Sequence, residues 1–373
     1  MKSSLARSGL LVALTALSSV AFAAPQHAGH LLVSSYGTLL LISPDGTQHP
    51  LAGDTNQALL SPDGSKVAFT TSSDPKNPAS TQLMVITPEE GGKTEIAELP
   101  KGSAFGHIAW EPDGNALAYD AVVHGKSDDL FIAPISGNAA DGRSPAPGMA
   151  LAPKSARNNL GHWYQGISFS PDGKQIVHAV NNGPDESGLE VLDRATQKRT
   201  LLYKTESIVW DARYSPDGKY IAYTMTIREP DRGDGDDVAD CTPPTIGLWL
   251  YSIEQKSAKQ VTVPKAPGDD MKNFAWSPDG KHIALTLGST DCDYPGSTAA
   301  VFLTDVGQTH QVRLSSGDMA FEPAFSPDGT GVAFVDFSQS PAKLMRYTIS
   351  TGKLDLIRQA PEESNYYTLL DWK

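Results

Sequence analysis

Several features that often reveal a protein's function are scarce or missing in this sequence of 373 residues. It has two cysteines, no run of Lys and Arg, and no long apolar stretch after its first 23 residues. The formal net charge is −13 at pH 7. Because an acidic surface repels phosphate backbones, this composition argues against nucleic-acid binding. Since no later stretch reaches membrane-spanning length, no membrane span is expected either.

Common signatures of catalysis and metal binding are also missing. The string Gly166-Ile167-Ser168-Phe169-Ser170 lacks the second glycine of a Gly-x-Ser-x-Gly nucleophile elbow. Neither His-Glu-x-x-His nor Cys-x-x-Cys occurs. The motifs therefore favour a non-catalytic protein, although they leave an enzyme open.

The N-terminus reads as an export signal. Lys2 and Arg7 precede an apolar run from Leu10 to Phe22, and small residues follow at Ala21 and Ala23. This pattern predicts a secretory signal peptide over 1–23, too short to span a membrane stably. We expect a mature chain of 24–373 that forms one domain and is periplasmic or secreted.

A repeated tetrapeptide is the strongest signal that is present. Ser-Pro-Asp-Gly or a close variant stands at 61–64, 111–114, 170–173, 215–218, 277–280 and 326–329, at intervals of 45 to 62 residues. Pro presets φ for a type I turn, Asp tolerates the next position, and Gly supplies the left-handed residue after it. An apolar strand pattern precedes and follows each copy. The repeat predicts one hairpin per unit, and four antiparallel strands per unit form a propeller blade.

The two ends of the chain complete the count of blades. Residues 30–52 read as a second, third and fourth strand, so the copy at 43–46 is expected between the third and fourth strands. Residues 367–372 have the pattern of a first strand. A composite blade built from both termini would close the ring and remove open sheet edges. We therefore predict an all-β, seven-bladed propeller, with a six-bladed ring as the alternative.

The repeat resembles that of the TolB-like β-propellers, whose WD40-like units read aromatic-Ser-Pro-Asp-Gly-Lys-x-Ile-Ala. The best matches are 276–284 and 214–222. The resemblance covers the propeller without the N-terminal α/β domain of TolB, because the blades begin by about His30. It implies the fold, and it connects the chain both to periplasmic assembly factors and to the propellers of prolyl-oligopeptidase-like enzymes.

Two cysteines and a group of acidic residues fall in loops between second and third strands. In an oxidising compartment, Cys241 and Cys292 are expected to form a disulfide, the rival being a free thiol or a metal ligand. The loop before Cys241 carries Asp231, Asp234, Asp236 and Asp237. Carboxylates in flexible loops suit calcium. A calcium site is one hypothesis and a solvated acidic loop the other; no other cofactor is expected.

Five polar residues share one place in the repeat, four residues before the turn. We call them the polar ring: Gln57, His107, Asp211, Asn273 and Glu322. At the start of the innermost strands, they are expected at the mouth of a central channel. They predict a small-ligand or peptide site, with acid–base work by His107 open to it. The alternative is that they line an ordinary tunnel with hydrogen-bonded groups and water.

A last candidate is the aromatic segment before the first strand of the third full unit. His162, Trp163 and Tyr164 lie among polar residues, and exposed aromatics are typical binding anchors. They could equally pack the loop onto its blade. The sequence thus predicts a non-catalytic scaffold that binds a protein or peptide of the periplasm or cell envelope. The alternative is a hydrolase or lyase acting on a glycan or peptide at the channel mouth.

Overall fold

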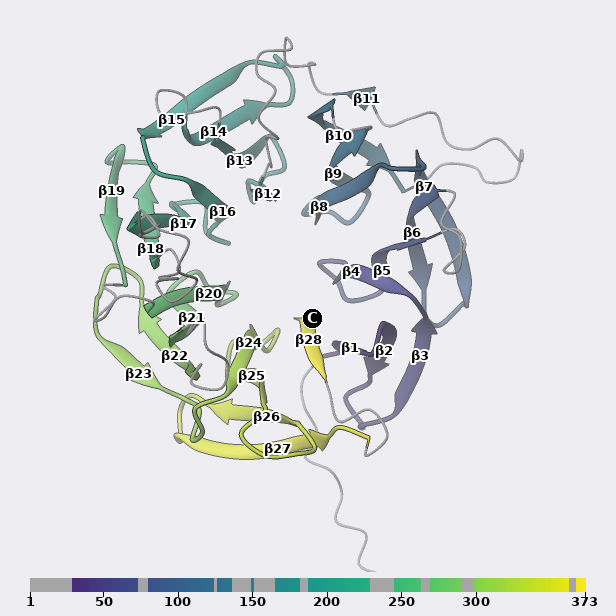
Figure 1. Ribbon diagram of the computed structural model, residues 1–373, viewed down its shortest axis with the longest axis vertical. Helices are drawn as coiled ribbons and strands as arrows, with labels where there is room; N and C mark the ends of the chain where they lie inside the picture. The colour runs from purple at the N-terminus through teal and green to yellow at the C-terminus, as the bar shows by residue number, and fades with distance from the viewer. Residues whose placement is uncertain are drawn as a thin grey trace, which may run out of the picture.

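The computed structural model describes residues 29–72, 80–123, 126–135, 149–150, 165–181, 187–228, 245–262, 269–289, 298–361 and 367–373. Within these ranges the strands form seven four-stranded antiparallel sheets. Figure 1 shows the sheets standing around one axis as the blades of a propeller. The prediction of an all-β, seven-bladed propeller is therefore confirmed, and the six-bladed alternative is wrong.

The strands of each blade run from the axis to the rim. In the order of blades 1 to 7, the inner strands are β28 (Thr368–Trp372), β4 (Thr55–Leu60), β8 (Ala104–Trp110), β12 (Gln165–Phe169), β16 (Val209–Tyr214), β20 (Asp269–Trp276) and β24 (Ala320–Phe325). The second strands are β1 (Leu31–Ser35), β5 (Val67–Ser72), β9 (Ala116–Val123), β13 (Gln175–Asn181), β17 (Tyr220–Arg228), β21 (His282–Ser289) and β25 (Gly331–Asp336).

The third strands are β2 (Thr38–Ile42), β6 (Ser80–Thr87), β10 (Lys126–Pro134), β14 (Ser187–Asp193), β18 (Thr245–Ser252), β22 (Thr298–Asp305) and β26 (Lys343–Thr348). The outer strands are β3 (Gln48–Ala52), β7 (Gly92–Pro100), β11 (Met149–Ala150), β15 (Arg199–Thr205), β19 (Ser257–Gln260), β23 (Gln311–Arg313) and β27 (Lys353–Gln359). Each of the six repeated turns joins the inner strand of its blade to the second strand.

Blade 1 is assembled from both ends of the described chain. Its inner strand β28 pairs with β1, and Trp372 stands opposite Leu31 in the register. The turn at 43–46 joins β2 to β3, so this copy lies between third and fourth strands as predicted. The composite blade is therefore confirmed, and its backbone ladder closes the ring.

The repeated turns are stabilised by their own polar groups. In the first copy, the Gly64 N–H donates to the Ser61 carbonyl oxygen at 2.9 Å, and the Ser61 hydroxyl donates to Asp63 Oδ1 at 2.6 Å. Lys66 N–H then donates to Ser61 Oγ at 2.9 Å. Gly64 has a φ of 73°, in the left-handed region that glycine adopts without strain. The serine, aspartate and glycine thus satisfy the turn locally, which explains why the motif recurs.

The hydrophobic core is divided among the interfaces between blades. The large apolar residue before each of the six turns packs toward the preceding blade, as Trp110 does against Leu83 and Ile96 of blade 2. The second strand contributes its alternate residues to the same layer, for example Leu117 and Tyr119. Burying each large side chain stabilises the fold by roughly 1.5–3 kcal/mol. The ring is therefore held by apolar layers that pack like the interior of a sandwich.

The turns also contact one another around the axis. The α-carbon of Gly114 faces Pro62 of the preceding turn, and Gly218 and Gly329 face Pro171 and Pro278 in the same way. At the seventh place, where blade 1 has no such turn, Gly29 with φ of 76° packs against Pro327 and Lys373. His30 and Lys373 pair through both backbone N–H groups there. The joined ends therefore occupy the place of a seventh turn.

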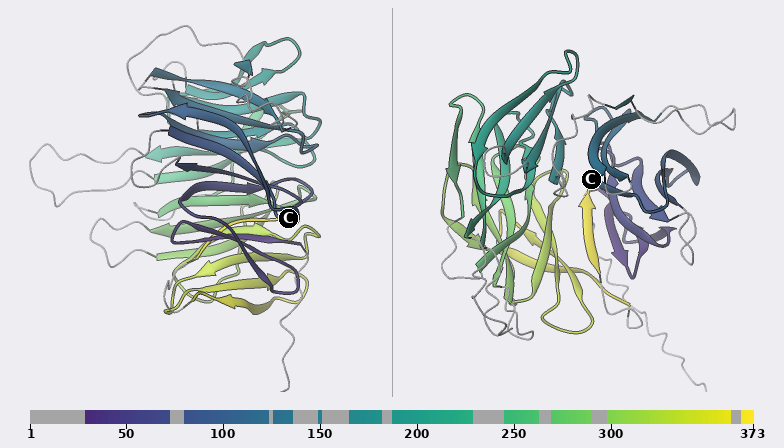
Figure 2. Two further views of the ribbon diagram at one scale, coloured as in Figure 1. Left: turned by 90° about the vertical axis from the view of Figure 1, so that its right-hand side faces the viewer. Right: turned by 45° about the horizontal axis from the view of Figure 1, so that its top comes forward.

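The ring has two distinct faces. Figure 2 shows the strands crossing the disc from one face to the other. We call the face with the six turns the turn face, and the opposite one, where second strands connect to third strands and blades connect to each other, the loop face. In the described ranges, no helix has the length and hydropathy that a membrane crossing requires.

Candidate functional site

The polar ring lies within the inner strands, where each strand carries a β-bulge. The pairing of β4 with β5 shifts between Thr55 and Gln57, and that of β16 with β17 between Val209 and Asp211. The other inner strands shift at the same place in the repeat. A bulge leaves backbone groups unpaired and redirects side chains. The ring residues are therefore set at a repeated irregularity, five of them on five different blades.

Inner-strand side chains four and two residues before the turn reach toward the following blade. Gln57 donates through Nε2 to the Gly106 carbonyl oxygen of blade 3. The same direction is taken by Ser168, which accepts from the Tyr214 N–H at 3.1 Å, and by Asp371, which accepts from the Leu60 N–H at 3.2 Å. Part of what the sequence predicted as a ligand site is thus engaged in joining blades.

Glu322 joins blade 7 to the strand that closes the ring. Its Oε2 accepts a hydrogen bond from the Leu369 N–H of β28 at 2.7 Å. Its φ of 61° is in the left-handed region, which is costly for a residue with a Cβ. Burial raises the pKa of Glu322 to about 7, and the bond from Leu369 opposes that rise only in part. The side chain is therefore a carboxyl group that changes its charge near neutral pH.

Asp211 pairs with an arginine two residues along its own strand. Arg213 Nη2 lies 2.6 Å from Asp211 Oδ2, and Arg213 Nη1 donates to the Phe274 carbonyl oxygen of blade 6 at 2.9 Å. The backbone of β12 approaches this pair closely, since a Cβ on Gly166 would collide with Asp211. Glycine at this place in blade 4 therefore makes room for Asp211.

His107 lies beside a buried carboxylate of the second strand. Its backbone N–H donates to Asp120 Oδ1, and its ring Nδ1 lies 3.8 Å from the same oxygen. The side chain of His107 is 43% exposed, whereas that of Asp120 is 3% exposed. A buried aspartate beside a partly exposed imidazole can help to orient the ring. Sequence reasoning selected His107 but missed Asp120.

Asn273 is the ring residue with unmet hydrogen-bonding capacity. Among the described residues its buried Oδ1 has no hydrogen-bond partner, and the same holds for Thr286 Oγ1. The two residues stand opposite each other in the register of β20 and β21. Buried polar atoms normally find a partner in protein, water or ligand. This pair is therefore the part of the ring best suited to receive a small polar group.

A buried ionic network on blade 4 was missed by sequence reasoning. His178 is 1% exposed, and its Nε2 lies 3.1 Å from Glu190 Oε1. Arg199 Nη1 lies 2.8 Å from the same carboxylate oxygen. These side chains lie on the face of the blade that turns Ile176 and Leu192 toward blade 3. A signal did exist, because His178 stands where other second strands carry Phe69 or Tyr119.

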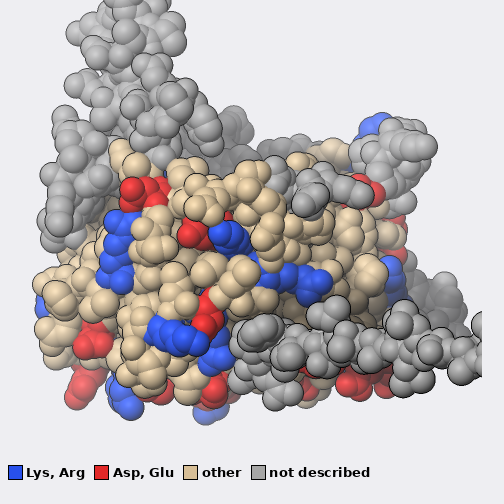
Figure 3. Space-filling view, turned by 90° about the horizontal axis from the view of Figure 1, so that it is seen from below, with Lys and Arg blue, Asp and Glu red and all other residues tan. Residues whose placement is uncertain are grey.

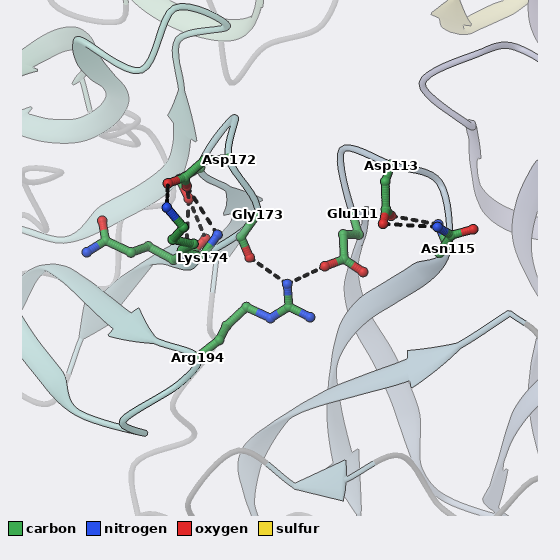
Figure 4. A network of polar contacts seen from close by, with 9 residues as sticks. Glu111, Asp113, Asn115, Asp172, Gly173, Lys174 and Arg194 are labelled. Atoms are coloured by element: carbon green, nitrogen blue, oxygen red, sulfur yellow. Dashed lines mark hydrogen bonds and ion pairs between the residues drawn. The ribbon is translucent and has the colours of Figure 1, made fainter.

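The turn face carries ionised aspartate carboxylates that accept hydrogen bonds within the turns. Hydrogen bonds, first those from the turn serines, lower the pKa of Asp63, Asp172 and Asp279 to about 2. In the turn of blade 3 a glutamate replaces the serine. Figure 4 shows Arg194 of blade 4 reaching between the two turns to contact the Glu111 carboxylate and the Gly173 carbonyl oxygen. The turn face thus uses its charges to hold neighbouring blades together.

The rim is a mixed surface on the side of β26 and β27. Figure 3 shows basic and acidic side chains lying next to each other among uncharged residues in the part of the rim that the structure describes. Lys353, for example, lies 2.7 Å from Asp355. This side of the rim has no broad patch of one sign in its described part, and so it is a poor candidate for electrostatic docking.

Exposed apolar side chains lie on the loop face. Tyr36 is 73% exposed at the tip of the β1–β2 hairpin. Ile208 and Ile227 are exposed at the same end of blade 5, where the Thr226 N–H donates to the Ile208 carbonyl oxygen at 2.9 Å. Large exposed apolar groups on rigid strand ends are typical of binding anchors. None of these three residues was predicted from the sequence as a binding residue.

Other predicted site residues lie outside the described ranges. These are His162, Trp163 and Tyr164, the acidic residues Asp231, Asp234, Asp236 and Asp237, and the cysteines Cys241 and Cys292. The partner loop, the calcium site and the disulfide therefore stay predictions. The strands that flank these segments, β12, β17, β18 and β21, begin or end at the loop face. Within the described part of the chain, no three His, Cys, Asp or Glu side chains form a group that could hold a metal ion.

Comparison with known proteins connects this geometry to two kinds of relative. No protein-family model matches the sequence. The chain is 24% identical over 343 residues to dipeptidyl-peptidase 5 of Porphyromonas gingivalis, which covers 84% of this chain and 44% of that protein. It is 24% identical over 207 residues to the Tol-Pal system protein TolB of Francisella tularensis subsp. mediasiatica, covering 53% of this chain and 41% of that protein.

A solved structure supports the same fold. The crystal structure of TolB from Acinetobacter baumannii superposes with a TM-score of 0.50 at 19% sequence identity, over 87% of this chain and 76% of that chain. The chain spans less than half the length of the curated relatives it matches. The similarity therefore establishes a TolB-like β-propeller, and it is a statement about the fold.

Proposed function

We propose that this TolB-like β-propeller is a non-catalytic scaffold that binds a protein or peptide partner on its loop face, in the periplasm or cell envelope. The signal peptide predicted over 1–23 and the similarity to a Tol-Pal system protein support the location. The partner loop predicted at 162–164 directly precedes β12 in the sequence, and β12 begins at this face.

One observation carries the proposal, the conformation of Tyr36. Tyr36 and Gly37 form the two-residue turn between Ser35 and Thr38, with φ values of 48° and 75°. Both values are positive, as in a type I′ hairpin turn, which favours Asn or Gly at the first position. A tyrosine there costs stability, of the order of 1 kcal/mol, and at 73% exposure it gains little by burial. A residue that strains the backbone and is displayed to solvent supports the proposal that this hairpin tip contacts a partner.

The sharpest test is a variant whose effects on folding and binding have opposite signs. Tyr36→Asn suits the turn, so we expect its free energy of unfolding to rise by about 0.5–1 kcal/mol. The same variant should weaken the partner complex by about tenfold or more. The partner is first captured from envelope extract by wild type, identified by mass spectrometry and purified for titration. A Tyr36→Asn chain that binds the purified partner as tightly as wild type would contradict the proposal.

Matched surface variants locate the binding face. Ile208→Ser changes the loop face, and Ile253→Ser changes an equally exposed isoleucine at the β18–β19 turn on the turn face; both side chains are 36% exposed. Only the first should weaken binding. A chain lacking Trp163 and Tyr164 tests the predicted partner loop separately, and equal capture by it and by wild type would remove that loop from the site.

A second candidate is a hydrolase or lyase that acts on a glycan or peptide at the axis. The exposed imidazole of His107 beside the buried carboxylate of Asp120 supports acid–base work. The test is a broad panel of glycans and peptides assayed with wild type, His107→Ala and Asp211→Asn. Turnover that wild type shows and these variants lose would favour the enzyme over the scaffold.

A further inference from the structure

Arg213 is a large cationic side chain in a ring of mostly small residues. It lies two residues before the turn of blade 5, and the same place in the other blades holds Leu59, Ala109, Ser168, Ala275, Ala324 and Asp371. It is the only arginine of the seven inner strands, all of which the structure describes. Although it lies on an inner strand, the Arg213 side chain is 45% exposed.

The guanidinium is held in place before any ligand arrives. Its Nη1 donates to the Phe274 carbonyl oxygen at 2.9 Å, and its Cζ lies 4.7 Å from the centroid of the Phe274 ring. Trp276 Nε1 donates to the Arg213 carbonyl oxygen at 3.4 Å, which ties the two inner strands together at the base of the side chain. A planar cation fixed over an aromatic ring loses little freedom when it binds, so its hydrogen bonds contribute more to affinity.

The contact with Asp211 shows that this guanidinium can bind a carboxylate group. Its Oδ2 lies 2.6 Å from Nη2, a charge-assisted contact between a carboxylate and the fork. A guanidinium has five N–H donors, and the bonds to Phe274 and Asp211 use two of them. Since nearly half of the side chain is exposed, the remaining donors can receive a second anion of the same geometry.

A second arginine of this protein serves as the contrast. Arg194 also lies over an aromatic ring, 5.3 Å from the centroid of Phe169. Its side chain is only 27% exposed, and its Nη1 is engaged by Glu111 and by the Gly173 carbonyl oxygen of two neighbouring turns. Arg194 therefore joins blades, whereas Arg213 joins blades and keeps nearly half of its side chain exposed.

We infer that Arg213, stacked on Phe274 and supported by Asp211, forms a binding site for an organic carboxylate at the axis of the ring. The site is distinct from the loop face, because Arg213 lies close to the turn end of β16. The ligand is either a small free carboxylate or the C-terminal carboxylate of a peptide; both present the same planar group to the fork. Asp211 limits the affinity, because it already occupies one side of the guanidinium and repels a second negative charge.

The test is calorimetric titration at constant ionic strength with three probes: sodium succinate, an acetylated tripeptide with uncharged side chains and a free C-terminal carboxylate, and the same tripeptide amidated. Wild type should bind at least one of the first two and not the third. Arg213→Lys keeps the charge but loses the fork, and should weaken binding by about tenfold. Asp211→Asn should tighten binding several-fold, since it removes the internal competitor. Arg194→Lys is the matched control and should bind as wild type does.

The outcomes distinguish the two possible ligands, and some of them would contradict the proposed site. Binding of succinate alone identifies a small-molecule site, and binding of the free peptide but not its amide identifies a peptide terminus. No binding of either carboxylate at millimolar concentration, equal binding by Arg213→Lys, or equal binding of the amidated peptide would each overturn the inference. Thermal melting of every variant shows that it is folded. Because Asp211→Asn leaves Arg213 in place, its tighter binding tests the site even if Arg213→Lys is unstable.

Discussion

The interface between blades 3 and 4 and the interface between blades 7 and 1 are built from the same strands of the repeat but from different chemistry. Blades 7 and 1 meet through an apolar layer that includes Tyr367, Trp372, Val335 and Leu344. Blades 3 and 4 share an apolar layer too, but His178, Glu190 and Arg199 form a buried ionic network beside it, and Glu111 with Arg194 forms an ion pair at the turn face.

The difference follows from what each interface must do. The pairing of β28 with β1 assembles blade 1 from both ends of the described chain, and the packing of this blade against blade 7 helps to hold the ring closed. Apolar burial supplies this without sensitivity to salt or pH. Blades 3 and 4 are consecutive in the chain, so their interface does not have to close the ring. A buried ionic network adds little net stability but is costly to break, and so it specifies one arrangement of the two blades.

The largest expected effect comes from removing a large apolar side chain from the layer between blades 7 and 1, where the ring closes. Trp372→Ala removes a side chain that is 1% exposed and that packs between blades 7 and 1. We expect the free energy of unfolding to fall by about 3–5 kcal/mol. Denaturant unfolding followed by tryptophan fluorescence and circular dichroism measures it. Leu356→Ala, at an exposed place on β27, is the control and should change stability by less than about 0.5 kcal/mol. A small loss in Trp372→Ala would show that the closure rests on backbone pairing instead.

Breaking the ionic network should have the next largest effect. Arg199→Met leaves Glu190 with His178 as its only partner in that network, and should cost about 2–3 kcal/mol. His178→Phe restores the aromatic residue that other blades carry and keeps the Glu190–Arg199 pair, so it should stay within about 1 kcal/mol of wild type. Denaturant unfolding of both variants and of wild type measures these differences in the free energy of unfolding. If Arg199→Met proves neutral, the network has no specifying role.

Glu322 lies at the closure, and its ionisation makes the stability of the fold depend on pH. Burial raises the pKa of Glu322 from 4.5 to about 7, so the folded state holds a proton that the unfolded state has lost between these values. The free energy of unfolding should therefore fall as pH rises from about 4.5 to 7, and change little above. Glu322→Gln cannot ionise and should exceed wild type at pH 8 by about 1–3 kcal/mol.

Melting temperatures between pH 4.5 and 8 measure this dependence. Glu254→Gln, at an exposed site, is the control and should keep the slope of wild type. A Glu322→Gln chain whose stability changes with pH as steeply as wild type would assign the slope to other groups.

The smallest effect is expected at the turn that joins blades 3 and 4. Glu111→Ser removes the ion pair with Arg194 and restores the serine of the repeat. Because the new hydroxyl can bond Asp113 as Ser61 bonds Asp63, loss and gain should nearly cancel, within about 0.5 kcal/mol. Denaturant unfolding at low and high salt separates them, since only wild type should weaken as salt rises. A loss above about 2 kcal/mol would make this ion pair a major part of the polar interface.

The fold could be read from the sequence because its determinants are local. The Ser-Pro-Asp-Gly turns satisfy their own polar groups, and strand alternation fixes which residues are buried. Even the copy at 43–46 was informative, since its shifted phase predicted the composite blade. A local pattern repeated six times leaves few topologies.

The candidate site was harder, because its partners come from other blades. The alignment of the repeat selected Gln57 and Glu322 as polar ring residues but could not show that their side chains contact Gly106 and Leu369 of the following blade. Asp120 and the network around His178 were missed for a similar reason: burial of a charge depends on packing between blades. Tyr36 was not selected, because its positive φ is seen only in the structure.

The pairing of His30 with Lys373 has a consequence for the topology of the chain. With Gly29 against Pro327, these ends stand where a seventh turn would be, so the ring has no blade that must come first. A Ser-Pro-Asp-Gly turn built between Trp372 and Leu31 would make the connection covalent, and the chain could then be opened at another turn while every blade keeps its four strands. The seven-bladed arrangement thus does not depend on which turn is opened, and circular permutation can test this.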